Sequence, residues 1–198
     1  MRKGFTLIEL LIVIGILAIL ATTVVLVLNP AQILRETRDT QRISDLSSVQ
    51  SAIGLMLATD PTIPTFTAGP FCTVAGCTIG AVAPFTCAGF TLTGCAVNTI
   101  RLVNGTGWVG IDLGGTSGGA PISTLPIDPN NNATHHYAYA GSDANKTYEL
   151  NGRFESDKIG VNAQNDGGED NACGCTGGVC ATLTAPGCWY EIGTTLGL

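Results

Sequence analysis

Residues 5–28 read FTLIELLIVIGILAILATTVVLVL, and this apolar stretch decides how the chain is organised. After Glu9 the run is uncharged for about 19 residues, close to the ~20 that a helix needs to cross a bilayer. Residues 1–4 read MRKG and place two basic side chains before the run. The positive-inside rule therefore predicts a long apolar helix whose N-terminus stays on the cytoplasmic side.

Two ordinary alternatives fit this stretch less well. A secretory signal peptide has an apolar region of roughly 7–15 residues followed by a small-residue cleavage site. Here the run is longer and leads directly into Asn29-Pro30. A plain membrane anchor leaves Glu9 unexplained, because a carboxylate at the centre of a membrane helix costs about 2.5–3.5 kcal/mol and somewhat less near its end. Glu9 is therefore a candidate functional residue.

The segment Lys3-Gly4-Phe5-Thr6-Leu7-Ile8-Glu9 resembles the prepilin signature of type IV pilins and type II secretion pseudopilins. The resemblance implies that a membrane-embedded prepilin peptidase cuts after Gly4 and N-methylates the new first residue, Phe5. It also places the family's glutamate, the fifth residue after the cut, at Glu9. The resemblance covers residues 1–30 strongly and the rest of the chain only in outline.

Cleavage changes the charges that would enter a filament core. It creates an α-amine on Phe5, which can pair with Glu9 of a neighbouring subunit and offset the cost of burying either charge alone. Loss of Arg2 and Lys3 leaves 7 of the 9 basic side chains against 15 acidic ones, a formal charge of −8 instead of −6. The expected partners are further copies of the chain, prepilin peptidase, the pilus or secretion assembly machinery and, before assembly, the membrane.

Beyond the apolar run, a helix kink is expected at Pro30, because proline removes a helical hydrogen bond. A second, amphipathic helix is expected to follow and to end at Thr59-Asp60-Pro61. Its apolar stripe has spacings of three and four residues and contains Ile43, Leu46, Val49 or Gln50, Ile53 and Leu57. Opposite charges at helical reach predict the solvated pairs Arg35–Asp39 and Arg42–Asp45. The alternative is that Arg35, Arg38 and Arg42 meet acidic groups of adjacent subunits.

The rest of the chain predicts an α+β fold, with the long helix packed on a small antiparallel β-sheet and disulfide-rich loops around it. β-branched and aromatic residues between polar turns predict strands at Thr99–Val103, Trp108–Leu113, Tyr137–Ala140 and Lys146–Phe154. The expected segments are a leader peptide (1–4), a transmembrane or filament-core helix (5–29), an amphipathic helix (30–59), a Cys-rich connecting loop (60–98), the antiparallel sheet (99–155) and a Cys-rich C-terminal tail (156–198).

Eight cysteines, an even number, favour disulfides formed in an oxidising compartment. We expect two groups that each pair internally: Cys72, Cys77, Cys87 and Cys95, then Cys173, Cys175, Cys180 and Cys188. The connectivity itself does not follow from the sequence. Structural zinc is disfavoured, because Cys173 and Cys175 are too close for a common zinc knuckle and no histidine is near.

The strongest candidate for a metal is a glycine-containing loop with three carboxylates, Asp166, Glu169 and Asp170. Calcium prefers such oxygen ligands, but the spacing does not match an EF-hand. A solvated acidic turn is the favoured interpretation, and calcium, which some pseudopilins bind, is the alternative. Asp128 and Asn130 form a second, poorer candidate. No other cofactor is expected.

No enzyme motif accounts for the remaining residues. Gly115–Gly119 looks somewhat like the nucleophile loop of chymotrypsin-like proteases, but His135 and His136 follow Ser117, whereas that family's histidine precedes its serine. We therefore expect a flexible hairpin turn and an exposed histidine pair. Neither a phosphate-binding loop nor an HExxH helix occurs. The acidic balance also argues against binding nucleic acid, which needs clustered Lys and Arg.

These observations predict a structural protein: a pilin subunit of a type IV pilus-like extracellular filament, held in the cytoplasmic membrane as a precursor with its globular part outside. Adhesion, twitching motility, DNA uptake and surface attachment are all open as roles. One alternative is a type II secretion pseudopilin that forms a short periplasmic pseudopilus. A second is a membrane-anchored extracellular binding module that forms no polymer.

Overall fold

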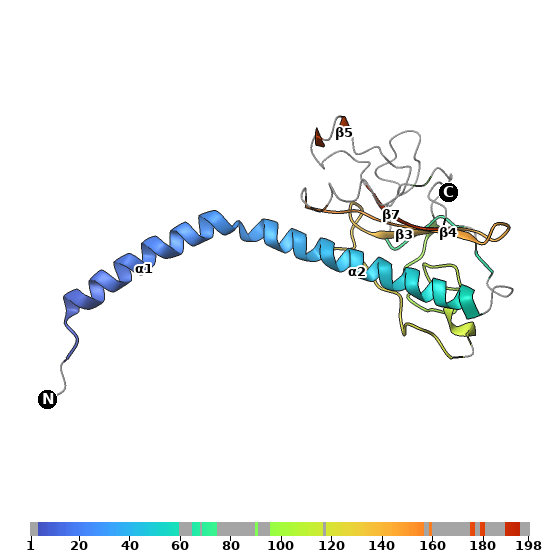
Figure 1. Ribbon diagram of the computed structural model, residues 1–198, viewed down its shortest axis with the longest axis horizontal. Coiled ribbons are helices and arrows are strands. Elements are labelled where there is room, and N and C mark those ends of the chain that lie inside the picture. The colour runs from blue at the N-terminus through green and yellow to red at the C-terminus, as the bar shows by residue number, and fades with distance from the viewer. Residues whose placement is uncertain are drawn as a thin grey trace.

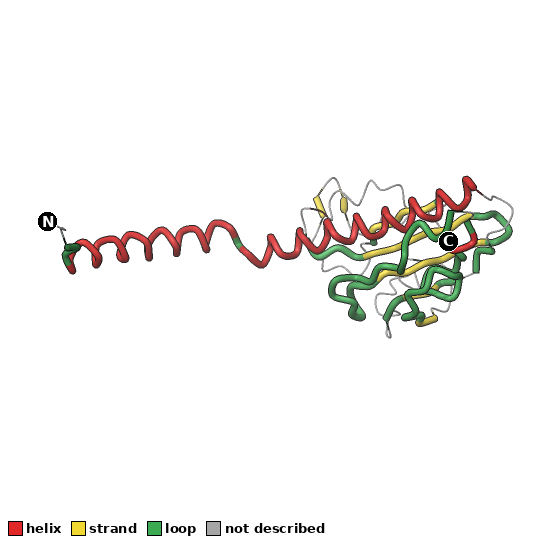
Figure 2. Tube along the Cα trace, turned by 90° about the horizontal axis from the view of Figure 1, so that it is seen from below, coloured by secondary structure: helices red, strands yellow, loops and turns green. Residues whose placement is uncertain are grey.

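The computed structural model describes residues 4–59, 65–67, 69–74, 90, 96–116, 118–156, 159, 175–176, 179–180 and 189–194. Two successive helices, α1 (Leu7–Leu28) and α2 (Pro30–Thr59), form a rod that runs from the N-terminus into a head containing the sheet (Figure 1). α1 extends away from the head, whereas the second half of α2 lies along the sheet (Figure 2). The predicted α+β class, with a long N-terminal helix and a small sheet, is confirmed.

The rod is interrupted at Asn29 and Pro30. α1 begins after the N-cap residue Thr6 and ends at Asn29, whose φ of 38° lies in the left-handed region that asparagine tolerates better than most residues. Pro30 then opens α2 at a first-turn position, where its missing N–H costs no helical hydrogen bond. The junction thus falls beside the proline at which the sequence predicts a kink.

The second half of α2 attaches the rod to the head through its apolar stripe. Leu46, Val49 and Ile53 are fully buried, and Ala52 and Met56 nearly so. Burying one such large aliphatic side chain stabilises a fold by about 1.5–3 kcal/mol. Leu46, Val49 and Ile53 of the predicted stripe are thus confirmed as buried, whereas Ile43 and Leu57 are half-buried. The buried residues pack on a core that includes Phe66, Trp108, Ile111, Leu125, Tyr137, Tyr139 and Leu150.

The main sheet has five strands in the order β2-β1-β3-β4-β7. Their bounds are β1 Phe71–Cys72, β2 Ala96–Val97, β3 Tyr137–Ser142, β4 Thr147–Gly152 and β7 Tyr190–Gly193. β1, β3, β4 and β7 are antiparallel to their neighbours in this order, but β2 runs parallel to β1 at one edge, so the sheet is mixed. The prediction of a purely antiparallel sheet is wrong at this edge. A separate hairpin pairs β5 (Cys175–Thr176) with β6 (Val179–Cys180).

The alternation of side chains along β3 gives the sheet two packed faces. Tyr137 and Tyr139 belong to the core under α2. Ala138 and Ala140 point to the opposite face, where a second buried cluster contains Cys72, Phe90 and Trp189.

Two of the four predicted strands do not form. The predicted strands Tyr137–Ala140 and Lys146–Phe154 correspond to β3 and β4, but Thr99–Val103 and Trp108–Leu113 lie in a loop. That loop makes one isolated bridge, Asn104 to Asp112, before a short 3-10 helix, η1 (Leu113–Gly115). The apolar residues of this loop contribute to the core instead: Trp108, Val109, Ile111 and Leu113 are fully buried. β1 and β2, of two residues each, lie in the segment expected to be a connecting loop in which small strands were possible, and β5, β6 and β7 lie in the expected tail.

Candidate processing and assembly site

The chain approaches α1 as an exposed, non-helical segment. Phe5 is 77% exposed, and a Cβ built on Gly4 would meet no atom within 4 Å. The fold of the chain itself therefore places no steric demand for glycine at this position. Any requirement for glycine at residue 4 would have to come from a partner that grips this segment.

Thr6 and Glu9 form a capping box at the start of α1. The Thr6 backbone N–H and hydroxyl donate to Glu9 Oε2 at 2.9 and 2.8 Å, and the Glu9 N–H donates to Thr6 Oγ1 at 3.3 Å. These bonds satisfy donors that a helix N-terminus otherwise leaves open. Glu9 is thus held in place within the chain, and the Thr-x-x-Glu spacing is a recognisable sequence signal for this box.

α1 presents apolar side chains to every side. Among the described residues, one helix, Leu7–Val25, is long and apolar enough to cross a membrane, and none of its 19 residues is buried in the structure. An apolar surface of this size on a soluble monomer is unusual and indicates contact with lipid or protein. Glu9 is the one acidic side chain in this helix.

A buried charge cluster locks α2 to the head. Arg42 is fully buried and donates from Nε and Nη2 to the two oxygens of Asp128, at 2.5 and 2.9 Å. It also bonds Asp39 Oδ1 at 2.7 Å and Glu155 Oε1 at 2.7 Å. Arg38 adds a second guanidinium on Glu155. Arg42 is therefore bonded by carboxylates from three parts of the chain: Asp39 of α2, Asp128 of a loop and Glu155, which follows β4.

The electrostatics of this cluster follow from its burial. Burial acts to raise the pKa of Glu155, but hydrogen bonds from Arg38 and Arg42 outweigh it and lower that pKa to about 2. Burial likewise acts to lower the pKa of Arg42, and Asp128, Glu155 and Asp39 together raise it above its ordinary value. Such a cluster is stable only while all its members are paired.

The two predicted helical ion pairs are wrong. Arg42 reaches back to Asp39 rather than forward to Asp45, and Asp45 Oδ2 accepts a hydrogen bond from the Tyr137 hydroxyl at 2.9 Å. Asp39 does not pair with Arg35; its carboxylate also accepts the backbone N–H groups of Glu155 and Ser156. Apart from the Arg42–Asp39 pair, these bonds could not be predicted from local spacing, because their partners lie more than 85 residues apart along the chain.

The metal candidates divide into two cases. Asp166, Glu169 and Asp170 lie outside the described residues, so calcium binding there stays a prediction. The second candidate, Asp128 with Asn130, is wrong, because Arg42 occupies both carboxylate oxygens of Asp128. In the described part of the chain, no group of three or more His, Cys, Asp or Glu residues could hold a metal ion.

Most of the predicted disulfide cysteines fall outside the described residues: Cys77, Cys87, Cys95, Cys173 and Cys188. Cys72 lies fully buried in β1 and carries no free thiol. Cys175 and Cys180 face each other across the β5–β6 hairpin. The pairing within two groups stays a prediction.

The expectation of an exposed histidine pair is also wrong. His136 is fully buried, with Nδ1 3.2 Å from the Asn132 carbonyl oxygen and its ring edge-on to Trp189 at 5.2 Å. Burial lowers its pKa to about 4. His135 is half-buried. His136 is therefore a neutral packing residue on the second face of the sheet.

The start of the chain is the part that comparison with known proteins identifies. Residues 1–25 match the family model of the prokaryotic N-terminal methylation motif. The motif ends inside α1 and so spans Gly4, Phe5, the capping box and most of the exposed apolar helix. No curated protein and no solved structure matches the chain.

The N-terminal methylation motif is the signature shared by type IV pilins and pseudopilins. It supports a pilin-like or pseudopilin precursor and indicates a structural subunit rather than an enzyme. It also implies processing by prepilin peptidase and assembly into a filament at the membrane. An apolar N-terminal helix that the described part of the head leaves uncovered fits a membrane-anchored precursor.

Proposed function

We propose that this chain is the pilin of a type IV pilus-like extracellular filament, cleaved after Gly4, N-methylated on Phe5 and polymerised through α1. One observation carries the proposal: the helix that bears the N-terminal methylation motif exposes its apolar side chains on all sides, while the head is already packed by α2. Other copies of the same helix can cover this surface once the subunit leaves the lipid.

The charges at the start of α1 support polymerisation with a defined register. Glu9 in an apolar helix is costly unless it is paired. The cleaved chain begins at Phe5, four residues before Glu9, so its α-amine lies at nearly the same depth as the carboxylate. An amine from one subunit and a carboxylate from the next would then neutralise each other in a shared apolar core.

Before assembly, the capping box at the start of α1 stabilises the Glu9 carboxylate. While the subunit is alone, Thr6 supplies two hydrogen bonds to the carboxylate, at 2.9 and 2.8 Å. These bonds reduce the cost of holding an unpaired carboxylate at the membrane surface. A neighbouring amine would add a charge-assisted bond that the isolated subunit lacks.

Replacement of Glu9 tests the proposal directly. Glu9→Ala should abolish surface filaments while leaving cleavage after Gly4 intact, because the acid acts in docking rather than in processing. The measurement combines electron microscopy of sheared surface fibres with mass spectrometry of the N-terminus, where N-methyl-phenylalanine is expected as the first residue. Glu36→Ala is the matched control, since Glu36 lies beyond the apolar helix on α2, and it should assemble normally.

The same experiment separates the alternatives. A membrane-anchored binding module would tolerate Glu9→Ala and would show no fibres even in the wild type. A pseudopilin would be cleaved and methylated in the same way, but intact cells would carry no long surface fibres. A wild-type protein that still begins at Met1 would refute the whole family of proposals.

A further inference from the structure

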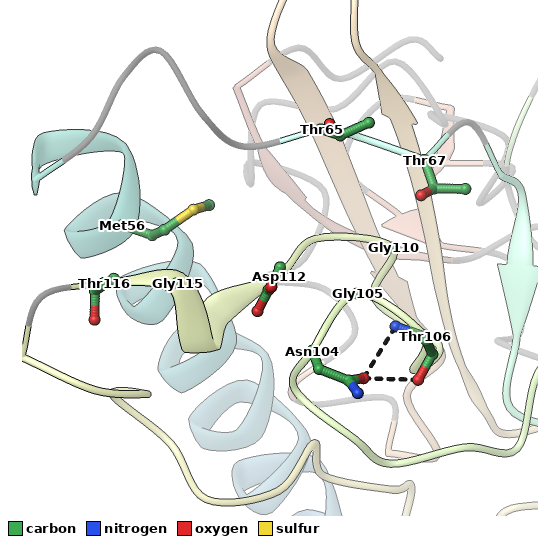
Figure 3. A pocket seen from close by; sticks show the side chains of 10 residues that line it. All are labelled: Met56, Thr65, Thr67, Asn104, Gly105, Thr106, Gly110, Asp112, Gly115 and Thr116. Carbon is green, nitrogen blue, oxygen red and sulfur yellow. Dashed lines mark hydrogen bonds between the residues drawn. The ribbon is translucent and has the colours of Figure 1, made fainter.

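A cavity of about 320 Å³ lies in the head, beside the C-terminal turns of α2. Its described lining comes from three segments: Met56 of α2, residues 65–67 and residues 104–116 (Figure 3). The end of α2 is the end of the rod farthest from the N-terminus (Figure 1). If α1 of the precursor is inserted in a membrane, as the proposed function requires, this end points away from the lipid.

The walls of the cavity are held by local bonds and by close backbone packing. Asn104 Oδ1 accepts from the Thr106 N–H and hydroxyl at 3.2 and 2.6 Å, and Asp112 Oδ1 accepts from the Gly114 N–H at 2.8 Å. A Cβ on Gly110 would come within 2.7 Å of Thr67 Cβ, so only glycine fits between these two segments. The side chains of Asn104, Thr106 and Asp112 are therefore held in place by local hydrogen bonds.

The unused atoms define the chemistry of a ligand. Because the Oδ1 atoms of Asn104 and Asp112 already accept hydrogen bonds within the chain, the Asn104 side-chain N–H groups and Asp112 Oδ2 remain available to a ligand. The hydroxyls of Thr65 and Thr67 make no hydrogen bond within the part of the chain that the structure describes. The cavity thus offers hydroxyl, amide and carboxylate groups against the apolar wall of Met56.

The charge of the lining residues also limits which class of ligand can bind in the cavity. Asp112 carries the sole formal charge among the described lining residues, and neither Lys nor Arg is present there. An anionic ligand would therefore meet repulsion without compensation. A neutral ligand that both donates and accepts at neighbouring positions fits best, because a carboxylate oxygen and hydroxyls can bind adjacent hydroxyl groups.

We propose that this cavity binds one neutral sugar ring of a glycan. The volume lies at the small end of the ~300–1,000 Å³ typical of ligand pockets, which suits a single ring rather than an extended chain. Binding through hydrogen bonds at a half-open site should be weak for one ring, with a Kd of about 1 mM. Many subunits along a polymer would raise the apparent affinity for a multivalent glycan surface.

Met56 provides a local reporter of binding. The chain has 2 methionines, Met1 in the leader and Met56 in the cavity wall, so methyl-labelled methionine gives two resolvable NMR signals. The full chain in detergent micelles would be titrated with D-glucose, D-galactose and N-acetyl-D-glucosamine. A saturable shift of the Met56 methyl with at least one sugar, and none of the Met1 methyl, is the expected result. D-glucuronate and glycerol serve as the anionic and non-specific controls.

A pair of matched variants tests the lining. Thr67→Val keeps the side-chain shape and the backbone bond of residue 67 to the Gly110 carbonyl, and it should weaken binding about five- to tenfold. Thr124→Val makes the same change at an exposed site outside the cavity and should leave the titration unchanged. Unfolding midpoints of both variants confirm that the head is intact.

Three results would overturn the proposal: no saturable Met56 shift with any neutral sugar, equal shifts with glucuronate or glycerol, or equal weakening by the two threonine variants. This titration reads the head alone, so its failure would leave the filament proposal standing. Conversely, a chain that binds sugar but never forms fibres would refute the filament and keep the sugar site.

Discussion

Arg42 is a fully buried cation that three carboxylates share, and its removal should be costly. Arg42→Ala leaves Asp39 and Asp128 buried without their partner and should lower the free energy of unfolding by about 3–5 kcal/mol. Arg35→Ala, on the exposed side of α2, should change it by less than about 0.5 kcal/mol. Urea unfolding followed by the fluorescence of the buried Trp108 and Trp189 measures both. Equal effects of the two variants would contradict the assigned role.

Glu155 should make the head sensitive to acid. Its pKa is about 2 in the folded chain against an ordinary value of 4.5, so its stabilisation is complete above pH 4.5 and is lost as pH falls toward 2. Glu155→Gln should therefore cost stability at pH 7, and its difference from the wild type should shrink across that window. Unfolding free energies measured from pH 7 to pH 2 test this. A difference that stays constant with pH would show that the charge of Glu155 is not responsible.

At the scale of elements, the break between α1 and α2 depends on two adjacent residues with different roles. Pro30 cannot donate a backbone hydrogen bond to α1, and Asn29 adopts the left-handed conformation that ends it. Pro30→Ala should let the two helices merge, with helical backbone chemical shifts at residues 28–31 in micelles. Pro129→Ala, in a loop of the head, is the control. If Asn29 stays left-handed in Pro30→Ala, the asparagine and not the proline sets the break.

At the scale of the whole molecule, the head should be thermodynamically independent of α1. The apolar residues of α1 up to Val25 are exposed, and the core is built from α2, the sheet and the loops. A chain of residues 30–198 should therefore be a soluble monomer, with an unfolding midpoint within about 2–4 °C of the full chain in detergent, equivalent to roughly 1 kcal/mol. Light scattering and thermal denaturation test this. Aggregation or unfolding of the shortened chain would show that α1 contributes to the fold of the head.

Local patterns in the sequence were sufficient for the rod and for the sheet centre. The spacing of Leu46, Val49 and Ile53 predicts the buried face of α2, and the Thr-x-x-Glu spacing is itself a helix-start signal. β3 and β4 follow from aromatic and β-branched residues around one polar turn. These features depend on neighbours within a few residues, which a sequence displays directly.

The predictions that were wrong all concern residues whose environment is set by parts of the chain distant in sequence. Residues 99–113 have the composition of strands, but their apolar side chains fill the space beside α2, and packing overrode β-propensity. His136 has a polar side chain but lies buried against Trp189, which is 53 positions further along the chain. Arg42 likewise bonds Asp128 and Glu155 rather than the nearby Asp45, because folding brings these distant carboxylates to it.

By itself, the sequence determined that this protein has an apolar N-terminal helix with a single acidic residue, a methylation motif at the start of the chain and a head that mixes helix and sheet. Only the tertiary structure decided which charges are buried, which strand-like segments become core loops and where a cavity opens. The reason is physical: helix period and capping act over one or two turns, whereas ion-pair choice and burial depend on groups that folding brings together from distant positions.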